Sequence, residues 1–146
     1  IMLLQVTNIT YTMSSTMKLH DFIVSIPSLN EEDCTTLRWY FDNNPDHHVV
    51  RDNEVQTFTE MNLNQFNANL GHFFGKKIRK LVERYLDVEL PFGDRFFPEN
   101  YGLEEFRIKR YNENECFKQH VDVGDLNSSK RFLAFLFYLN SDFEGG

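Results

Sequence analysis

The stretch ECFKQHVDVGDLNSSKRFLAFLFYLN, residues 115–140, places a histidine and an aspartate two positions apart, just before an almost wholly apolar run. Successive side chains of a β-strand point to opposite faces, so residues i and i+2 share one face. If residues 115–123 form a strand, His120 and Asp122 aim at the same point and Val121 lies behind them. The stretch therefore predicts two ionisable side chains that converge without a special loop.

An imidazole nitrogen and a carboxylate oxygen are two of the three protein ligands in the facial triad that holds non-haem iron(II). The spacing of His120 and Asp122 is a weak motif by itself, because both could lie on the solvated face of a half-buried strand. The next predicted strand, residues 131–140, is apolar on both faces and carries the hydroxyl of Tyr138. That hydroxyl could serve a binding site or bond a backbone carbonyl in the core.

Two helices are predicted upstream of this stretch. In PSLNEEDCTTLRWYFDNN, residues 27–44, Ser28 or Asn30 is the expected N-cap, and three acidic residues follow in the first turn. The helix is expected to end near Asn43 or Asn44. A second helix of roughly 20 residues or more is predicted by apolar residues that recur every three or four positions. They are Phe66, Leu70, Phe73, Phe74, Ile78, Leu81, Val82 and Tyr85.

Further strands are predicted on both sides of these helices. Residues 17–26 favour a short strand or an extended lead-in, and residues 44–60 favour either a loop or a short edge hairpin. LEEFRIKRY, residues 103–111, alternates as a strand. One face would carry Phe106 and Ile108, and the other Arg107, Lys109 and Tyr111. Helices come first in this reading and strands cluster last, so an α+β fold is expected.

Composition is that of a single globular domain of 146 residues with 15 Phe, six Tyr and one Trp to bury. The net charge of −7 argues against nucleic acid as a partner, and no apolar stretch is long enough to span a membrane. Cys34 and Cys116 fit neither a disulfide framework nor a zinc site, which favours a cytoplasmic setting. Because the chain opens on Ile and Met13 or Met17 could be the start, residues 1–16 are expected to be an untranslated or disordered leader.

The C-terminal part resembles the iron(II)- and 2-oxoglutarate-dependent oxygenases, most closely their prolyl 4-hydroxylase-like branch. The family pattern has a Tyr ending one strand, a Phe or Tyr three residues before H-x-D, an Arg opening a strand that finishes Y-L-N, and a Gly-Gly. The matching residues are Tyr111, Phe117, His120, Asp122, Arg131, Tyr138, Leu139, Asn140, Gly145 and Gly146. The match covers about forty residues closely.

This resemblance implies that His120 and Asp122 are iron ligands and that Tyr111 and Tyr138 face the 2-oxoglutarate site. It also implies a double-stranded β-helix, or jelly roll, with N-terminal helices packed outside one sheet. The family places its second histidine ligand and the Lys or Arg that pairs with 2-oxoglutarate beyond the Gly-Gly. Residues 17–146 are therefore expected to be the N-terminal part of one oxygenase domain, which would be inactive alone. The apolar run at residues 131–140 also needs more cover than the few following residues supply.

The activity implied by the resemblance is hydroxylation of an aliphatic C–H bond, with a peptidyl, prolyl-type or related substrate and with succinate and CO2 as co-products. Fe(II) would be the cofactor, 2-oxoglutarate the cosubstrate, and ascorbate an additional reductant. One alternative is a non-catalytic jelly-roll interaction module that keeps a remnant metal site. Another is a cupin-like metal enzyme, which would need further His or Glu ligands near His120 and Asp122, and the sequence shows none.

Overall fold

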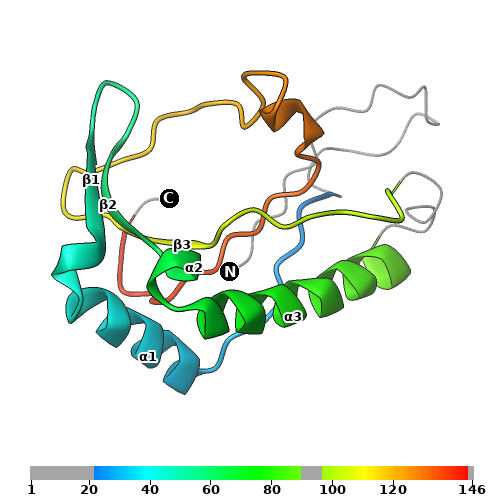
Figure 1. Cartoon of the computed structure of the whole chain (residues 1–146), viewed down its shortest axis with the longest axis horizontal. Coiled ribbons are helices and arrows are strands. Elements are labelled where there is room, and N and C mark those ends of the chain that lie inside the picture. The colour runs from blue at the N-terminus through cyan, green and yellow to red at the C-terminus, as the bar shows by residue number, and fades with distance from the viewer. Residues whose placement is uncertain (1–21, 90–96, 145–146) are drawn as a thin grey trace. The chain divides into compact units, whose positions relative to one another are not determined.

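The computed structural model describes residues 22–89 and 97–144 (Figure 1). The expected leader at residues 1–16 lies outside the described residues. The chain divides into two compact units. One unit, which we call the sheet unit, comprises Thr35–Leu81 and Pro98–His120, and the other, the terminal unit, comprises Ile1–Cys34, Val82–Phe97 and Val121–Gly146. Each unit is described by itself.

The sheet unit contains a three-stranded antiparallel sheet of order β1-β2-β3 (Figure 1). Its strands are β1, His48–Asp52, β2, Thr57–Asn62, and β3, Arg107–Arg110. The hairpin was one of the two alternatives for residues 44–60, and it is the correct one. Its turn forms because the side chain of Asn53 accepts hydrogen bonds from the backbone N–H groups of Val55 and Gln56, at 2.9 and 3.0 Å.

One face of the sheet, which we call the helix face, packs against a helix. Met61 and Ile108 are cross-strand partners at its centre and are 0% and 9% exposed. The C-terminal end of the helix α1, Glu31–Asp42, contacts this face. The Phe41 ring stacks on the His48 ring with 4.1 Å between their centroids, and the guanidinium of Arg110 lies 3.2 Å from the carboxylate of Asp42. Burial of apolar side chains between α1 and the sheet forms this part of the core.

The helix α1 begins where the sequence predicts. The side chain of Asn30 accepts a hydrogen bond from the backbone N–H of Asp33 at 2.7 Å, which satisfies a donor that the first turn of a helix leaves without a partner. Leu37 and Phe41 are the buried residues of this helix. The predicted N-cap and the predicted end near Asn43 are both confirmed.

The long helix predicted from the apolar stripe is confirmed as α3, Ala68–Arg84, which continues into a π-helical turn, Tyr85–Glu89. The structure differs at the start, where extended backbone at Asn67 separates a short helix α2, Leu63–Phe66, from α3. The buried residues of α3 follow the predicted apolar stripe. They include Phe74, Ile78, Leu81 and Val82. None of the described helices combines the length and the apolar character that crossing a membrane would need.

The segment before β3 runs beside α3 (Figure 1), and two contacts fix it there. The ring of Phe106 lies 5.6 Å from that of Phe74, and the backbone N–H of Phe106 donates to the side chain of Asn64 at 2.8 Å. Gly71 permits the close approach of Asn64, because a Cβ at position 71 would lie 2.8 Å from the Asn64 side-chain nitrogen. As predicted, Ile108 is buried while Arg107 is exposed.

Two predictions about strands are wrong, because among the described residues neither 115–123 nor 131–140 forms a strand. For residues 17–26 a short strand and an extended lead-in were both open, and the described residues 22–26 form no strand. A strand requires a neighbour that completes its backbone hydrogen bonds, and in 115–123 only Phe117 makes a bridge, to Gln56. The order of elements also differs, because β1 and β2 precede α3. The α+β class is nevertheless confirmed.

Candidate functional site

The second face of the sheet is polar, and we call it the basic face. Directly opposite residues of antiparallel strands share a face, so the register of Val49 with Glu60, Glu60 with Lys109, and Asn62 with Arg107 defines it. Its members are Val49, Arg51, Phe58, Glu60, Asn62, Arg107 and Lys109. Three cations stand against one carboxylate there, although the whole chain carries a net charge of −7.

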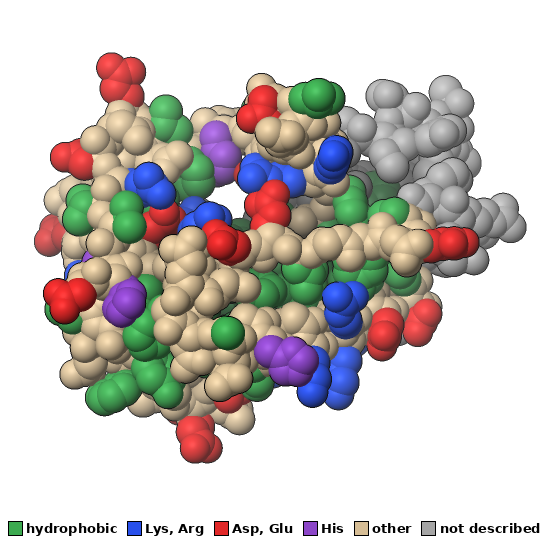
Figure 2. Space-filling model, in the orientation of Figure 1, with side chains coloured by type: hydrophobic (Ala, Val, Ile, Leu, Met, Phe, Trp, Pro, Cys, Tyr) green, Lys and Arg blue, Asp and Glu red, His purple; other side chains and the backbone are tan. Residues whose placement is uncertain are grey.

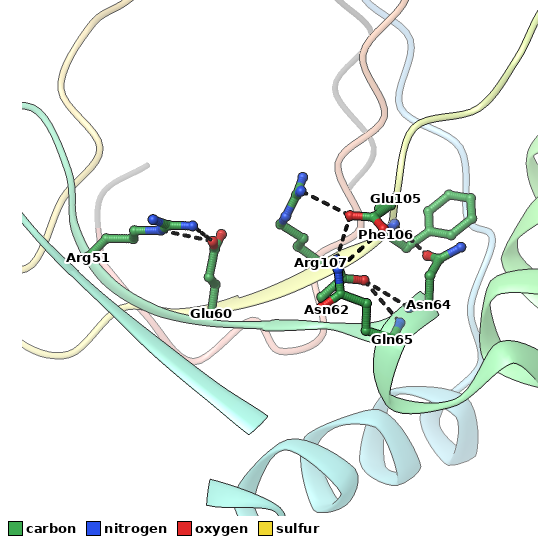
Figure 3. Close-up of polar contacts among 8 residues, drawn as sticks. All are labelled: Arg51, Glu60, Asn62, Asn64, Gln65, Glu105, Phe106 and Arg107. Carbon is green, nitrogen blue, oxygen red and sulfur yellow. Dashed lines mark hydrogen bonds and ion pairs between the residues drawn. The ribbon is translucent and has the colours of Figure 1, made fainter. Parts of the chain in front are cut away.

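A buried carboxylate lies at the centre of the basic face. Glu60 is only 6% exposed, and its Oε1 accepts hydrogen bonds from Nε and Nη2 of Arg51 at 2.9 and 2.6 Å. Charge-assisted hydrogen bonds of this kind compensate the loss of hydration that burial imposes on a carboxylate. Glu60 therefore fixes the position of the guanidinium of Arg51 (Figure 3).

A second carboxylate organises the end of the basic face next to α2. Glu105 accepts hydrogen bonds from the side chains of Asn62, Gln65 and Arg107 at 2.6, 3.4 and 3.3 Å (Figure 3). Asn62 also accepts from the backbone N–H of Gln65 and so caps α2. The cap and the carboxylate network hold Arg107 in a defined orientation.

The residues around Glu60 and those around Glu105 line one hollow of about 190 Å³. The residues around it are His47, Val49, Arg51, Glu60, Asn62, Gln65, Glu105 and Arg107. The lining contains two guanidinium groups, two carboxylates, two amides and an imidazole. Figure 2 shows charged side chains of both signs spread over the surface, with hydrophobic side chains exposed between them.

The other end of the basic face is aromatic. The Phe58 ring lies 5.2 Å from that of Tyr111 and 5.7 Å from that of Phe117. The ammonium of Lys109 lies 4.6 Å from the centre of Phe58 and 4.8 Å from that of Phe117, which are cation–π distances. Phe117 in turn stacks on His120, with 3.7 Å between centroids and 12° between the ring planes.

A tight turn directs the chain from β3 back to the hairpin. The backbone N–H of Glu115 donates to the carbonyl of Asn112 at 3.0 Å, and Asn114 adopts a positive φ of 67°, which Asn tolerates better than most residues. After the turn, Thr57 donates its backbone N–H to the carbonyl of Cys116 at 2.8 Å. The predicted residues Tyr111 and His120 are therefore both held at the aromatic end of the basic face.

The imidazole of His120 has a defined tautomer in its contact with Lys118. Nδ1 lies 2.8 Å from the carbonyl oxygen of Lys118, and a carbonyl can only accept, so Nδ1 carries the proton in this hydrogen bond. In the neutral ring Nε2 then carries the lone pair that a metal ion requires. Metal-binding histidines commonly make such a hydrogen bond through their other nitrogen, so the donor set of His120 fits an iron ligand.

The other two predicted residues belong to the terminal unit. The backbone carbonyl of Asp122 accepts a hydrogen bond from Arg131 at 2.8 Å. Tyr138 stacks on Phe143 at 5.6 Å and lines a hollow of about 290 Å³ whose polar residues include Ser25. The boundary between the units falls after His120, so the structure brings Tyr111 together with His120 and places Asp122 and Tyr138 only within their own unit.

No group of three or more His, Cys, Asp or Glu side chains in residues 22–89 and 97–144 could hold a metal ion. The predicted pair of His120 and Asp122 is smaller than such a group, so this finding does not test it, and the pair remains a prediction.

The sequence analysis missed the polar half of the basic face. Arg107 was assigned to the correct face of its strand, but Arg51 and Glu60 lie in the segment for which loop and hairpin were both open. Arg51 and Glu60 are nine positions apart, on either side of the Asn53 turn. If the segment is taken as a hairpin, their opposite charges lie on the same face of neighbouring strands, and this is the sequence signal for the pair.

We compared the chain with protein-family models, with curated proteins and with solved structures, and none of the three comparisons found a match. The functional interpretation therefore depends on the residues and on their arrangement.

Proposed function

We propose that this chain carries part of the active site of an iron(II)- and 2-oxoglutarate-dependent dioxygenase with a jelly-roll fold, which hydroxylates a peptidyl, prolyl-type or related aliphatic C–H bond. The observation that carries the proposal is the hydrogen bond from Nδ1 of His120 to the Lys118 carbonyl at 2.8 Å. It leaves the ligating nitrogen in the form that iron(II) requires. The sequence pattern from Tyr111 to Gly146 adds the resemblance to that family.

In this proposal the chain contributes ligands and positions them. His120 and Asp122 would hold iron(II), which supplies the oxygen-dependent redox chemistry when it is bound. The stacking of Phe117 restricts the plane of the His120 ring, and the Lys118 carbonyl holds its tautomer. Lys109 places a positive charge at the same end of the sheet, which favours the approach of an anionic cosubstrate.

The first experiment measures metal binding by the chain under anaerobic conditions, with Fe(II) or with Mn(II) followed by electron paramagnetic resonance. Weak but saturable binding is expected, because two protein ligands hold a divalent ion less firmly than three. His120→Ala and Asp122→Ala should each abolish it. The matched controls His72→Ala and Asp87→Ala change exposed residues of α3 and of the turn after it, and should leave binding unchanged.

The second experiment measures turnover in the natural gene product, as 2-oxoglutarate-dependent release of succinate. Loss of turnover in His120→Ala with retained folding is the expected result. Tyr138→Phe should mainly weaken 2-oxoglutarate binding, by about 1 kcal/mol for one lost hydrogen bond. Metal binding that survives in both ligand variants would contradict the proposal, and metal binding without any turnover would favour the non-catalytic interaction module.

A further inference from the structure

We infer that the hollow lined by Arg51 and Arg107 on the basic face is a binding site for a small organic dicarboxylate. The site is separate from the proposed iron ligands, and the inference does not depend on the iron chemistry. It rests on the N–H donors of two oriented guanidinium groups and on the size and polarity of the hollow.

The guanidinium groups have donors beyond those used in their described contacts. A guanidinium has five N–H donors in a planar fork that matches a carboxylate. The contacts of Arg51 with Glu60 use Nε and Nη2, and the contact of Arg107 with Glu105 uses Nη2. The Nη1 groups of both arginines take no part in these contacts, so each guanidinium can donate to one more carboxylate oxygen.

The two arginines are oriented before any ligand arrives. The carboxylate of Glu60 is nearly buried and holds two nitrogens of Arg51, while Glu105 is held by three side chains, one of which is Arg107. A side chain that is already ordered loses less conformational entropy on binding. The two carboxylates support the arginines and also balance their charge within the hollow, so recognition of a ligand depends on the oriented N–H donors that remain.

The spacing of the arginines favours a ligand with two acidic groups. Arg51 is registered with Phe58 of β2 and Arg107 with Asn62, four residues further along the same strand. Four residues of an extended strand cover about 13 Å, yet both side chains line one hollow. A single small anion cannot lie against both guanidinium groups as well as a molecule with a carboxylate at each end.

The size of the hollow restricts the ligand further. Its volume of about 190 Å³ is below the roughly 300 to 1,000 Å³ of pockets for drug-sized ligands. The amide of Gln65 and the imidazole of His47 offer further hydrogen bonds at the wall. A short-chain dicarboxylic acid, free or as an acidic residue at a peptide C-terminus, fits this combination of size, charge and polarity.

The test is calorimetric titration of the chain in the presence of a metal chelator, so that a failure of the proposed metal site cannot affect it. Saturable binding of succinate is expected, with binding of acetate and of inorganic phosphate at least tenfold weaker, and no binding of the neutral analogue succinamide. Affinity should fall as salt is raised. Stronger binding of a peptide ending in glutamate would identify a peptide C-terminus as the source of the two carboxylates.

Variants connect the binding to the two arginines. Arg107→Gln should weaken succinate binding about tenfold or more, as expected for a lost charge-assisted hydrogen bond. Because Arg51→Gln alone would leave the buried carboxylate of Glu60 without its cation, the double variant Arg51→Gln with Glu60→Gln removes both charges together. The same weakening is expected there. Arg38→Gln changes an exposed arginine of α1, and His120→Ala changes the proposed iron ligand, and neither should alter succinate binding.

The inference is overturned if the chain shows no saturable binding of succinate. It is equally overturned if phosphate binds as tightly as succinate, if both arginine variants bind as the original chain does, or if Arg38→Gln weakens binding as much as Arg107→Gln. Folding of each variant is checked by circular dichroism before titration.

Discussion

The two faces of the small sheet bury their centres by different means. On the helix face, Met61 and Ile108 are covered by apolar packing. On the basic face, Glu60 is buried through its ion pair with Arg51, and Phe58, 1% exposed, lies beneath the ammonium of Lys109. Apolar packing is non-directional and is not subject to electrostatic screening, whereas ion pairs and hydrogen bonds require defined geometry and exposed ion pairs weaken as salt is raised.

This difference separates stability from recognition within one layer of the structure. The apolar contacts of the helix face stabilise the sheet, because each buried aliphatic or aromatic side chain contributes roughly 1.5 to 3 kcal/mol, and Phe58 adds to this on the basic face. The charged contacts of the basic face contribute little net stability but leave oriented donors at the surface. The basic face is therefore where ligand chemistry is proposed.

The largest expected effect is on the helix face. Met61→Ala removes a side chain that is 0% exposed, and it should lower the free energy of unfolding by about 2 to 5 kcal/mol because it leaves a cavity. Val50→Ala is the matched control, since Val50 has the same strand parity but is 71% exposed and should change stability by less than about 0.5 kcal/mol. Urea denaturation of both variants measures the difference. Equal effects would show that burial at the centre of the helix face does not carry the stability assigned to it.

An intermediate effect is expected at the end of the basic face. Asn62→Ala removes the cap of α2 and a donor to Glu105, and it should cost about 1 kcal/mol of unfolding free energy. Asn69→Ala, an exposed position in the first turn of α3, is the control and should be close to neutral. Urea denaturation again gives the values. A loss as large as that of Met61→Ala would show that the polar cluster carries stability comparable with the apolar face.

The smallest effect lies outside the sheet, in the terminal unit. The backbone N–H of Ser128 and then its hydroxyl donate to Asp125, at 2.7 and 2.9 Å, and lower the pKa of that carboxyl below its ordinary value of 3.8. A lowered pKa in the folded state gives stability that is present above the unfolded value and is lost as the pH falls through the folded value. Carbon NMR titration should give a midpoint below 3.8 for Asp125. The midpoint should rise in part in Ser128→Ala, which removes the hydroxyl and keeps the backbone N–H, and a midpoint that stays the same would contradict the contribution of the hydroxyl.

Local signals in the sequence predicted the helices well. The N-cap at Asn30 and the apolar stripe through Phe74 and Ile78 depend on residues a few positions apart, so they can be read without knowing the fold. The alternation of residues 107–110 predicted β3 for the same reason. The equally apolar residues 131–140 form no strand, because a strand needs a partner that a sequence pattern cannot supply.

The residues of the candidate sites also differ in whether the sequence could predict them. Sequence proposed His120 and Tyr111, and the structure holds both at one end of the basic face, whereas Asp122 and Tyr138 are placed in the other unit. The contribution of Arg51 was not predicted, because its side-chain contact with Glu60 requires the β1–β2 hairpin, which pairs Arg51 with Phe58 and places Glu60 diagonally across on the same face.

The sequence alone determined where α1 begins and ends, which residues form the apolar stripe of α3, and which side chains of β3 point to solvent, because these properties arise from near neighbours along the chain. Only the tertiary structure decided which strands exist and which charges share a face. Those outcomes depend on hydrogen bonds and ion pairs between distant segments, and such contacts form only when the chain has already brought their partners together.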